Sequence, residues 1–477
     1  MEGNNTILEF AIVGHPNEGK SSVVSTLSED DSVRISSTPG ETIECRSFPV
    51  RIDGEEIIRF IDTPGFQNPK KTLVWLRDHR ETDDRLIELF CETHKRDLDF
   101  KGEYRLFTPI AGGAGIIYVV DGSRPVRKND KAEMEILRLT GRPRMAIINC
   151  KEEDDQYLEN WKNEFRKHFN SIRVFNAHKA TYAERIDLLE SLKSIDQDWQ
   201  SALERVILAF KQDWALRNIR TAEIICELLS DCLGFYVIKN FTDDSRSDSV
   251  KKRLQDEYKK EIESIERKAH QKIKKLFKHN IFNFDLPPQS ILDEDLFDIK
   301  TWQVLGLTQK QLVATGLVAG GTIGAALDIA AAGLTFGVFT AIGGALGAGS
   351  ALFGGEQMAK AKVSGLKIGG FQIKIGPNDN IQFPYVLLDR ALIFYSYVIN
   401  WAHGRRDYKR VEDKRSWDET SKRGFAMNWD DKSRKICNSF FKAIQGNDEH
   451  RKEQFRREVV ELLKGYLDAI SKSEHKG

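Results

Sequence analysis

Short apolar runs alternate with longer amphipathic stretches over the first 196 residues of the chain. The runs are rich in β-branched and aromatic residues, each ends at or before Gly, Asp or Asn, and they occupy residues 7–14, 57–61, 115–120, 145–148 and 172–175. Short strands separated by helices are typical of a parallel sheet with helices on both faces. The pattern therefore predicts an α/β domain over residues 1–196, built on a mostly parallel sheet.

One strand pair departs from this parallel pattern. An amphipathic run over Ile43–Ile52 reaches Asp53-Gly54, and the next strand follows at once. Asp-Gly between two such runs is a strong signal for an antiparallel hairpin. Farther along, charged and aromatic residues separate Gly65 from the strand at 115. We predict a helical insertion there, at about 67–110.

Helical periodicity dominates from residue 197. Within residues 197–300, apolar positions recur every three or four residues from Leu254 to Leu276, which predicts a long charged helix. Its heptad-like seam is compatible with a coiled coil between chains, but packing within its own domain is the favoured interpretation. Residues 371–477 are predicted to be mixed and mainly helical, ending in an amphipathic helix with Phe455, Val459, Leu462, Leu463, Tyr466 and Ile470 on one side.

The segment 311–355, within a predicted unit at 301–370, has a different composition. Glycine and alanine dominate it, Asp328 is its one formal charge, and glycines recur every fourth residue. Small residues at this spacing let two helices approach closely. One interpretation is a helical hairpin that enters a membrane, since each arm is near the length needed to span. The other is a tightly packed soluble pair or a homo-oligomer interface, because burying Asp328 in lipid is costly.

Charge and cysteine content narrow the class of protein. Lys plus Arg and Asp plus Glu both number 72, so overall charge gives no argument for a nucleic-acid or acidic partner. The six cysteines are scattered without a C-x-x-C pair, which suits a reducing compartment and argues against a disulfide framework or a zinc site. The N-terminal residues lack the pattern of a secretion signal. We therefore expect a cytoplasmic protein, associated with the inner face of the membrane if residues 311–355 insert.

The strongest chemical signal is the sequence G-x-x-x-x-G-K-S, which runs from Gly14 to Ser21. It lies between a predicted strand and a helix, where backbone N–H groups and the helix dipole can hold phosphate. In such a loop the lysine, here Lys20, bridges the β- and γ-phosphates, and the Ser21 hydroxyl binds Mg²⁺. The predicted nucleotide-binding residues of this loop are Gly14, His15, Pro16, Asn17, Glu18, Gly19, Lys20, Ser21 and Ser22.

Two further motifs lie where a nucleotide switch requires them. Asp62-Thr63-Pro64-Gly65 ends a predicted strand, so Asp62 can hold the Mg²⁺ shell through water and the Gly65 N–H can meet the γ-phosphate. Between this motif and the first lies Thr38-Pro39-Gly40-Glu41-Thr42, from which Thr42 can supply a second hydroxyl to Mg²⁺. The predicted catalytic residues are Lys20, Thr42 and Gly65, and the predicted Mg²⁺ residues are Ser21, Thr42 and Asp62.

These three motifs together resemble those of the bacterial Era, TrmE and EngA group of GTPases, over roughly residues 7–180. The glycine-zipper half resembles a bacterial set within that group that carries a large C-terminal domain of unknown function. The resemblance implies GTP and Mg²⁺ as ligands and, by family analogy, RNA or the ribosome as a partner. It also implies that Asn17 helps to hold K⁺, which can replace an arginine finger electrostatically. Phe66 stands where Ras-like proteins have a water-orienting glutamine, and Gln67 is the alternative residue for that role.

The base-reading motif departs from the pattern of the group. The group has Asn-Lys-x-Asp after the fifth core strand, and this chain has Asn149-Cys150-Lys151-Glu152. Asn149 is kept, Glu152 takes the place of the base-reading aspartate, and Ala177 can offer a backbone N–H to the base oxygen. Phosphate binding is thus better supported by the sequence than the choice of guanine over adenine.

Two functions from different classes fit these residues. The first is a GTP-hydrolysing switch whose loops are coupled to the helical half of the chain. The second is a hydrolysis-poor nucleotide-binding scaffold or membrane-interaction protein, which the altered base motif and the missing glutamine favour. The intact set of Lys20, Ser21, Thr42 and Asp62 favours the switch.

Overall fold

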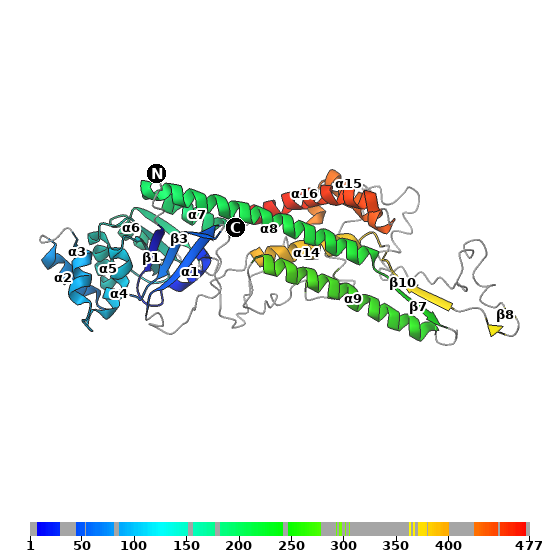
Figure 1. Cartoon of the computed structure of the whole chain (residues 1–477), viewed down its shortest axis with the longest axis horizontal. Helices are drawn as coiled ribbons and strands as arrows, with labels where there is room; N and C mark the ends of the chain where they lie inside the picture. Colours follow the sequence, from blue (N-terminus) through cyan, green and yellow to red (C-terminus); the bar gives the residue numbers. More distant parts are fainter. Residues whose placement is uncertain are drawn as a thin grey trace.

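The computed structural model describes residues 7–28, 44–52, 54–80, 85–150, 156–176, 182–241, 247–277, 292, 295–297, 301, 305, 362–363, 366–367, 371–378, 380–399, 424–446 and 449–473. These residues form an elongated molecule with an α/β domain at one end and a helical region at the other (Figure 1). A single long helix runs from the first into the second.

A six-stranded sheet forms the centre of the α/β domain. Its strands lie in the order β2-β3-β1-β4-β5-β6. All neighbours are parallel except the hairpin pair β2 and β3. The mostly parallel sheet with one antiparallel pair, predicted from the apolar runs, is therefore confirmed. The strands are β1 (Leu8–Val13), β2 (Arg46–Ile52), β3 (Glu55–Asp62), β4 (Gly115–Asp121), β5 (Arg144–Asn149) and β6 (Ser171–Phe175).

Helices cover both faces of the sheet, and alternate side chains of each strand enter one core or the other. On β1, Phe10 and Ile12 pack toward one face, and Ala11 and Val13 pack toward the opposite face. Helices on the first face are α1 (Lys20–Ser28), α7 (Tyr182–Lys193) and the start of α8 (Gln200–Gly234). Those on the second face are α2 (Pro69–His79), α3 (Leu86–His94), α4 (Lys101–Ala111), α5 (Lys128–Leu139) and α6 (Leu158–Phe165).

Helices α2, α3 and α4 lie in the stretch for which the sequence predicts a helical insertion. An aromatic cluster joins them: the Phe90 ring makes edge contacts with Trp75, Phe100 and Phe107 at centroid distances of 5.1, 5.5 and 5.0 Å. Such edge-to-face pairs stabilise packing beyond simple burial of area. The three helices therefore form one packed unit beside the sheet, and α4 lies closest to β1.

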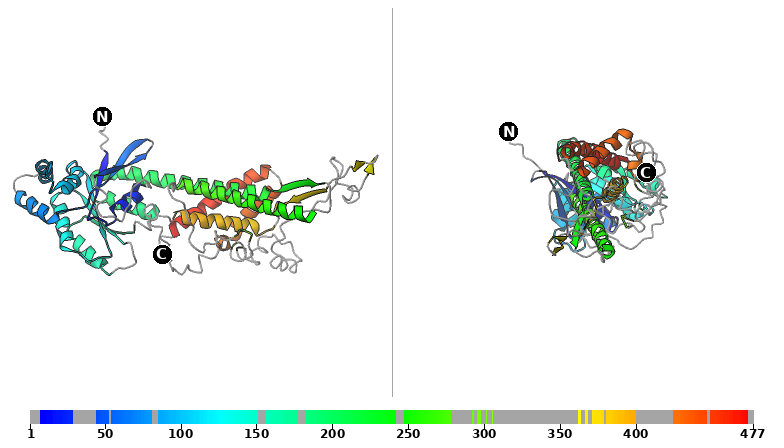
Figure 2. Two further views of the ribbon diagram at one scale, coloured as in Figure 1. Left: turned by 90° about the horizontal axis from the view of Figure 1, so that it is seen from below. Right: turned by 90° about the vertical axis from the view of Figure 1, so that its right-hand side faces the viewer.

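Helix α8 belongs to two hydrophobic cores. It has 35 residues, which at 1.5 Å per residue is about 50 Å. Leu203, Val206 and Ile207 pack into the core of the α/β domain, whereas buried residues from Trp214 to Leu233 pack into the core of the helical region. The short helix η1 (Gln197–Trp199) precedes α8. Figures 1 and 2 show α8 running along the long axis of the molecule.

The helical region packs α8 against α9 (Ser247–Leu276), α14 (Phe383–Ile399), α15 (Asp431–Gln445) and α16 (Glu449–Ser473). Helix α9 is the long charged helix predicted from the sequence, and it packs against α8 of the same chain, as the intramolecular interpretation requires. A buried ion pair joins α9 to α14, with Arg390 Nε 2.6 Å from Glu266 Oε1. The remaining elements are β7 (Val237–Phe241), β8 (Lys362–Val363), β9 (Leu366–Lys367), β10 (Phe371–Ile375) and η5 (Ala426–Asn428), and β10 pairs with β7 in antiparallel fashion.

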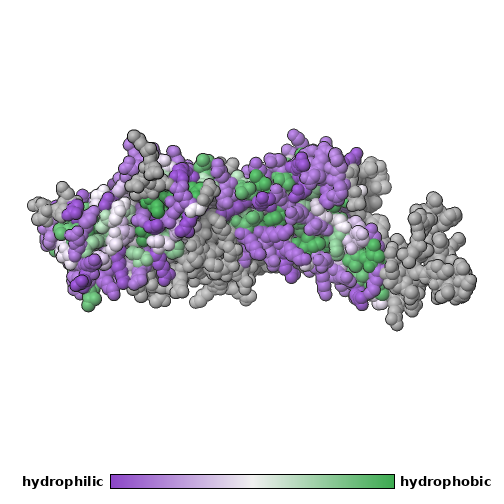
Figure 3. All heavy atoms as spheres, viewed as in Figure 1, coloured by the Kyte–Doolittle hydropathy of each residue, from purple (hydrophilic) through white to green (hydrophobic). Residues whose placement is uncertain are grey.

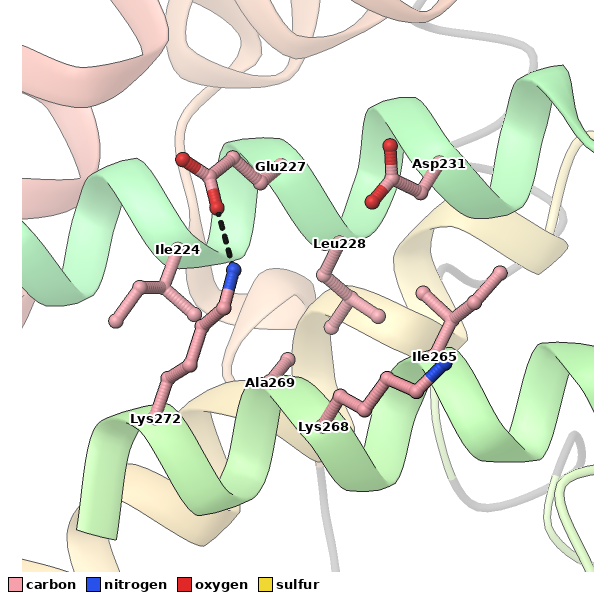
Figure 4. Close-up of a pocket in the computed structure, with 8 residues that line it drawn as sticks. All are labelled: Ile224, Glu227, Leu228, Asp231, Ile265, Lys268, Ala269 and Lys272. Atoms are coloured by element: carbon pink, nitrogen blue, oxygen red, sulfur yellow. Dashed lines mark hydrogen bonds and ion pairs between the residues drawn. The ribbon is translucent and has the colours of Figure 1, made fainter. Parts of the chain in front are cut away.

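Polar residues cover much of the face shown in Figure 3, and apolar residues appear over part of the helical region. A hollow of about 150 Å³ lies between α8 and α9, with an apolar floor and a charged rim on which Lys272 Nζ is 3.0 Å from Glu227 Oε2 (Figure 4). Its lining comes from Ile224, Glu227, Leu228, Asp231, Ile265, Lys268, Ala269 and Lys272.

The glycine-rich segment 311–355 lies outside the described residues, so the membrane hairpin and the packed soluble pair both stay predictions. Within the part of the chain that the structure describes, no helix is both long enough and apolar enough to cross a membrane.

Candidate nucleotide-binding site

The loop between β1 and α1 lies close against the backbone of β4. Gly14 has a φ of 149°, and a Cβ at this position would lie 2.3 Å from the Val119 carbonyl oxygen, so a side chain does not fit. Asn17 has a φ of 68°, a left-handed conformation that asparagine tolerates better than most residues. The sequence positions required for a phosphate-binding loop therefore have the backbone geometry of one.

Lys20, the first residue of α1, lies over this loop. Its Nζ donates to the carbonyl oxygens of His15 at 3.0 Å and Gly14 at 3.4 Å. Burial lowers the pKa of Lys20, while the carboxylates of Asp62, Glu18 and Glu133 oppose that shift. An ammonium group held by carbonyl oxygens can exchange them for phosphate oxygens, which bear full charge.

Ser21 and Asp62 lie side by side because β1 and β3 are parallel and their carboxyl ends meet at the same edge of the sheet. The Ser21 hydroxyl donates to Asp62 Oδ2 at 2.7 Å, and Asp62 is 2% exposed. A hydroxyl and a carboxylate are oxygen ligands that suit Mg²⁺, which takes most of its other ligands from water and phosphate. The pair therefore fits Mg²⁺. Thr42, the third predicted ligand, lies outside the described residues.

Glu18 of the loop is tied to the domain behind it by an ion triad. Arg124 Nε lies 2.9 Å from Glu18 Oε1, and Arg124 Nη1 lies 2.7 Å from Asp130 Oδ2. All three side chains are at most 13% exposed. The second Glu18 oxygen accepts the backbone N–H of Asp121. The side chain thus fixes the loop from behind, and Glu18 can serve the nucleotide through its backbone only.

His15 is tied to α5 in a similar way. Its Nδ1 lies 3.1 Å from Glu133 Oε1, and the Tyr118 hydroxyl donates to Glu133 Oε2 at 2.9 Å. The hydrogen bond with Glu133 raises the pKa of His15, and burial raises the pKa of Glu133. No sequence motif marks Glu133, Arg124 or Asp130. Charged side chains in polar sequence are usually solvated, and only the fold brings these three under the loop.

The base-reading end of the site is described in part. Asn149 is fully buried at the end of β5, and its Nδ2 donates to the Glu18 carbonyl oxygen at 3.1 Å. Cys150 is half-buried, and its backbone N–H donates to the Phe175 carbonyl at 2.9 Å. Asn149 therefore joins the base motif to the phosphate loop. Glu152 and Ala177 lie outside the described residues.

Phe66 is buried rather than directed at the phosphate site. It is 1% exposed, and its ring lies 6.3 Å from that of Phe107 on α4. Gln67 also points elsewhere, because its side chain lies against Gly102, where a Cβ would be 2.7 Å from Gln67 Cδ. Neither residue is placed to orient water in this structure, whereas the predicted residues Gly14 to Ser22, Asp62, Gly65 and Asn149 gather at one edge of the sheet.

A curled phosphate loop, a lysine over it, a Ser–Asp pair and a linking asparagine together define a P-loop GTPase domain. Residues 9–150 match the family model described as 50S ribosome-binding GTPase. Residues 162–464, more than half of the chain, match the model described as Domain of unknown function (DUF3482), and the chain belongs to this family.

Curated relatives match less than half of the chain. GTPase Der of Rhodopirellula baltica is 25% identical over 167 residues, which are 35% of this chain and 32% of the relative. The tRNA modification GTPase MnmE of Thermotoga maritima is 24% identical over 220 residues, 45% of this chain and 42% of the relative. The chain thus spans less than half the length of these relatives. A solved structure of Era in complex with MgGDPNP and nucleotides of 16S ribosomal RNA is 18% identical and covers 50% of this chain and 74% of that chain, with a TM-score of 0.28.

Proposed function

We propose that this protein binds GTP with Mg²⁺, hydrolyses it slowly, and acts as a nucleotide-dependent switch coupled to its helical region. The observation that carries the proposal is the arrangement of Lys20, Ser21 and Asp62 at one edge of the sheet, with Ser21 Oγ 2.7 Å from Asp62 Oδ2. The GTPase relatives support the same activity.

The residues of the loop act by position and charge. Lys20 would contact the β- and γ-phosphates, and Ser21 and Thr42 would bind Mg²⁺, which neutralises charge on the phosphates when it is bound. Asp62 would hold water in the Mg²⁺ shell, and Gly65 would donate its N–H to the γ-phosphate. No covalent nucleophile is needed, because phosphoryl transfer to water depends on positioning and electrostatic stabilisation.

The route to the helical region is α8. Its first three turns pack on the face of the sheet that also carries α1, and its residues from Trp214 to Leu233 form part of the helical core. The Phe10 ring of β1 contacts Trp199, directly before α8, at a centroid distance of 4.8 Å. Because a helix is stiff, a tilt of α8 on the α/β domain would move the helical region with it.

Calorimetric titration with GTP, GDP and ATP, together with phosphate release from GTP, tests the activity. We expect GTP to bind more tightly than ATP, and release to be absent in Lys20→Ala. Binding of GTP without Lys20-dependent phosphate release would support the alternative of a hydrolysis-poor scaffold. Equal affinities for GTP and ATP would contradict guanine specificity, for which Glu152 and Ala177 are the proposed base contacts.

We also propose assistance by K⁺ held with the help of Asn17. The support is the asparagine at this position of the loop and its left-handed backbone. Phosphate release is expected to be faster in KCl than in NaCl at equal ionic strength, and Asn17→Gly, which keeps the backbone conformation, should remove the difference. Equal rates in the two salts would refute the proposal.

Contact of residues 311–355 with a membrane, or with a second copy of the chain, is proposed from the sequence alone. Carbonate washing of a membrane fraction and the mass of the purified protein in solution distinguish these partners. The family model described as 50S ribosome-binding GTPase suggests the ribosome as a further partner, and cosedimentation with ribosomes in GTP and GDP tests it.

A further inference from the structure

Glu103, on helix α4 of the insertion, holds the backbone that follows Gly65. Its Oε1 accepts the N–H of Gln67 at 2.7 Å and the N–H of Asn68 at 2.5 Å. Two consecutive amides therefore converge on one carboxylate oxygen. Hydrogen bonds to a charged group are stronger than those between neutral groups, so this pair fixes the chain two and three residues beyond Gly65.

Stability of the fold does not by itself explain a buried carboxylate at this position. Glu103 is fully buried, and its second oxygen, Oε2, has no hydrogen-bond partner among the described residues. A buried carboxylate with an unpaired oxygen is destabilising relative to a fully satisfied one. An apolar residue of similar size would pack α4 equally well. The hydrogen bonds of Glu103 to the Gln67 and Asn68 amides are therefore the better explanation for a glutamate at this position.

The held segment lies directly against the phosphate loop. A Cβ on Gly65 would be 2.6 Å from Pro16 Cδ and 2.7 Å from Pro16 N, so the two backbones are in contact. Between Gly65 and the two fixed amides stands Phe66, buried against Phe107 of the same helix. The backbone around Gly65 is thus bounded by the phosphate loop on one side and by α4 on the other.

The same helix also contacts the chain beyond Thr42. Arg105 Nη2 lies 3.3 Å from Glu44 Oε1, and the Cys45 thiol donates to the Arg105 carbonyl oxygen at 3.2 Å. Glu44 follows Thr42 by two residues in the sequence. One turn of α4 therefore contacts residues that follow both of the predicted switch residues, the Mg²⁺ ligand Thr42 and the γ-phosphate contact Gly65.

We propose that Glu103 is a positioning residue of the GTPase site: through Gln67 and Asn68 it places the Gly65 N–H for the γ-phosphate, and it couples α4 to the nucleotide state. This inference rests on the proposed function. Glu103 contacts no part of the nucleotide. Its effect is confined to the triphosphate, because GDP has no γ-phosphate for Gly65 to meet.

The test compares affinities for fluorescent GDP and a fluorescent non-hydrolysable GTP analogue, both with Mg²⁺. Glu103→Leu should weaken binding of the analogue about tenfold and binding of GDP less than twofold, because two backbone donors lose their acceptor. Glu103→Gln keeps an oxygen acceptor and should restore most of the loss. Leu106 is buried on the same helix, and its side chain makes no hydrogen bond to Gln67 or Asn68. Leu106→Ala is therefore the control for loosened packing and should leave the ratio of the two affinities unchanged.

A ratio that stays the same in Glu103→Leu, or that shifts as much in Leu106→Ala, would overturn the positioning role while leaving GTP binding intact. If the wild type binds neither nucleotide, the proposed function itself fails. If the Glu103→Leu variant does not fold, hydrogen exchange of the backbone amides in the wild-type protein tests the coupling instead. Protection by the analogue relative to GDP in both 64–70 and 101–111 supports the coupling, and protection confined to 64–70 refutes it.

Discussion

Replacement of Arg124 by methionine should strongly destabilise the α/β domain. The guanidinium bridges Glu18 of the phosphate loop and Asp130 of α5, whose side chains are 5% and 2% exposed. Methionine keeps much of the volume but leaves both carboxylates buried without their cation. Breaking a buried ion pair from one side costs about 3–5 kcal/mol. The domain lies in the size range where 1 kcal/mol shifts the unfolding midpoint by about 2–4 °C, so the expected loss is roughly 6–20 °C.

Thermal and urea unfolding measure this loss, and Arg138→Met is the matched control. Arg138 pairs with Glu135 on the surface of α5 at 2.7 Å, with side chains 38% and 19% exposed, and such a pair contributes less than about 1 kcal/mol. A double change, Glu18→Gln with Arg124→Met, should recover part of the stability because one buried charge is removed. Equal small effects of Arg124→Met and Arg138→Met would refute the reasoning.

Three further predictions concern the same loop. Asn149→Ala removes the hydrogen bond to the buried Glu18 carbonyl and should weaken GDP binding about tenfold, which titration calorimetry would measure. The hydrogen bond to Glu133 raises the pKa of His15, so the imidazolium form favours the folded state; this stabilisation is complete below the pKa of an unfolded histidine and is lost as pH rises through the raised pKa. Over that pH window the free energy of unfolding should therefore fall more with rising pH in the wild type than in His15→Ala, and parallel pH curves would contradict this. Removing Mg²⁺ with EDTA should weaken GTP in the wild type but change little in Ser21→Ala, as titrations in both conditions would show.

The sequence was sufficient for the parts of the fold that repeat a simple pattern. Buried strands are short apolar runs, and Asp53-Gly54 marks the hairpin, so the sheet followed from hydrophobic periodicity. Ser21 and Asp62 could be paired because Ser21 lies at the start of the helix that follows β1 and Asp62 ends β3, and these parallel strands end at the same edge. These features depend on local sequence and on the regular geometry of a parallel sheet, so a single sequence is enough to predict them.

The supports of the site could not be predicted in this way. Arg124, Glu133 and Glu103 stand in helical or loop sequence rich in charge, where a solvated side chain is the usual expectation. Their burial follows from how α4 and α5 pack on the sheet. The motif places Phe66 where Ras-like proteins have a water-orienting glutamine, and the structure buries it against Phe107 because α4 presents an apolar face there.

The shared helix α8 has a practical consequence for how the protein can be divided. A fragment that stops at residue 196 leaves open to water the apolar sheet face that is covered by Trp199, Leu203, Val206 and Ile207. Exposed apolar surface of that kind favours aggregation. A fragment that continues to about residue 210 keeps this face covered. The working unit for refolding and crystallisation is therefore the α/β domain together with the first three turns of α8.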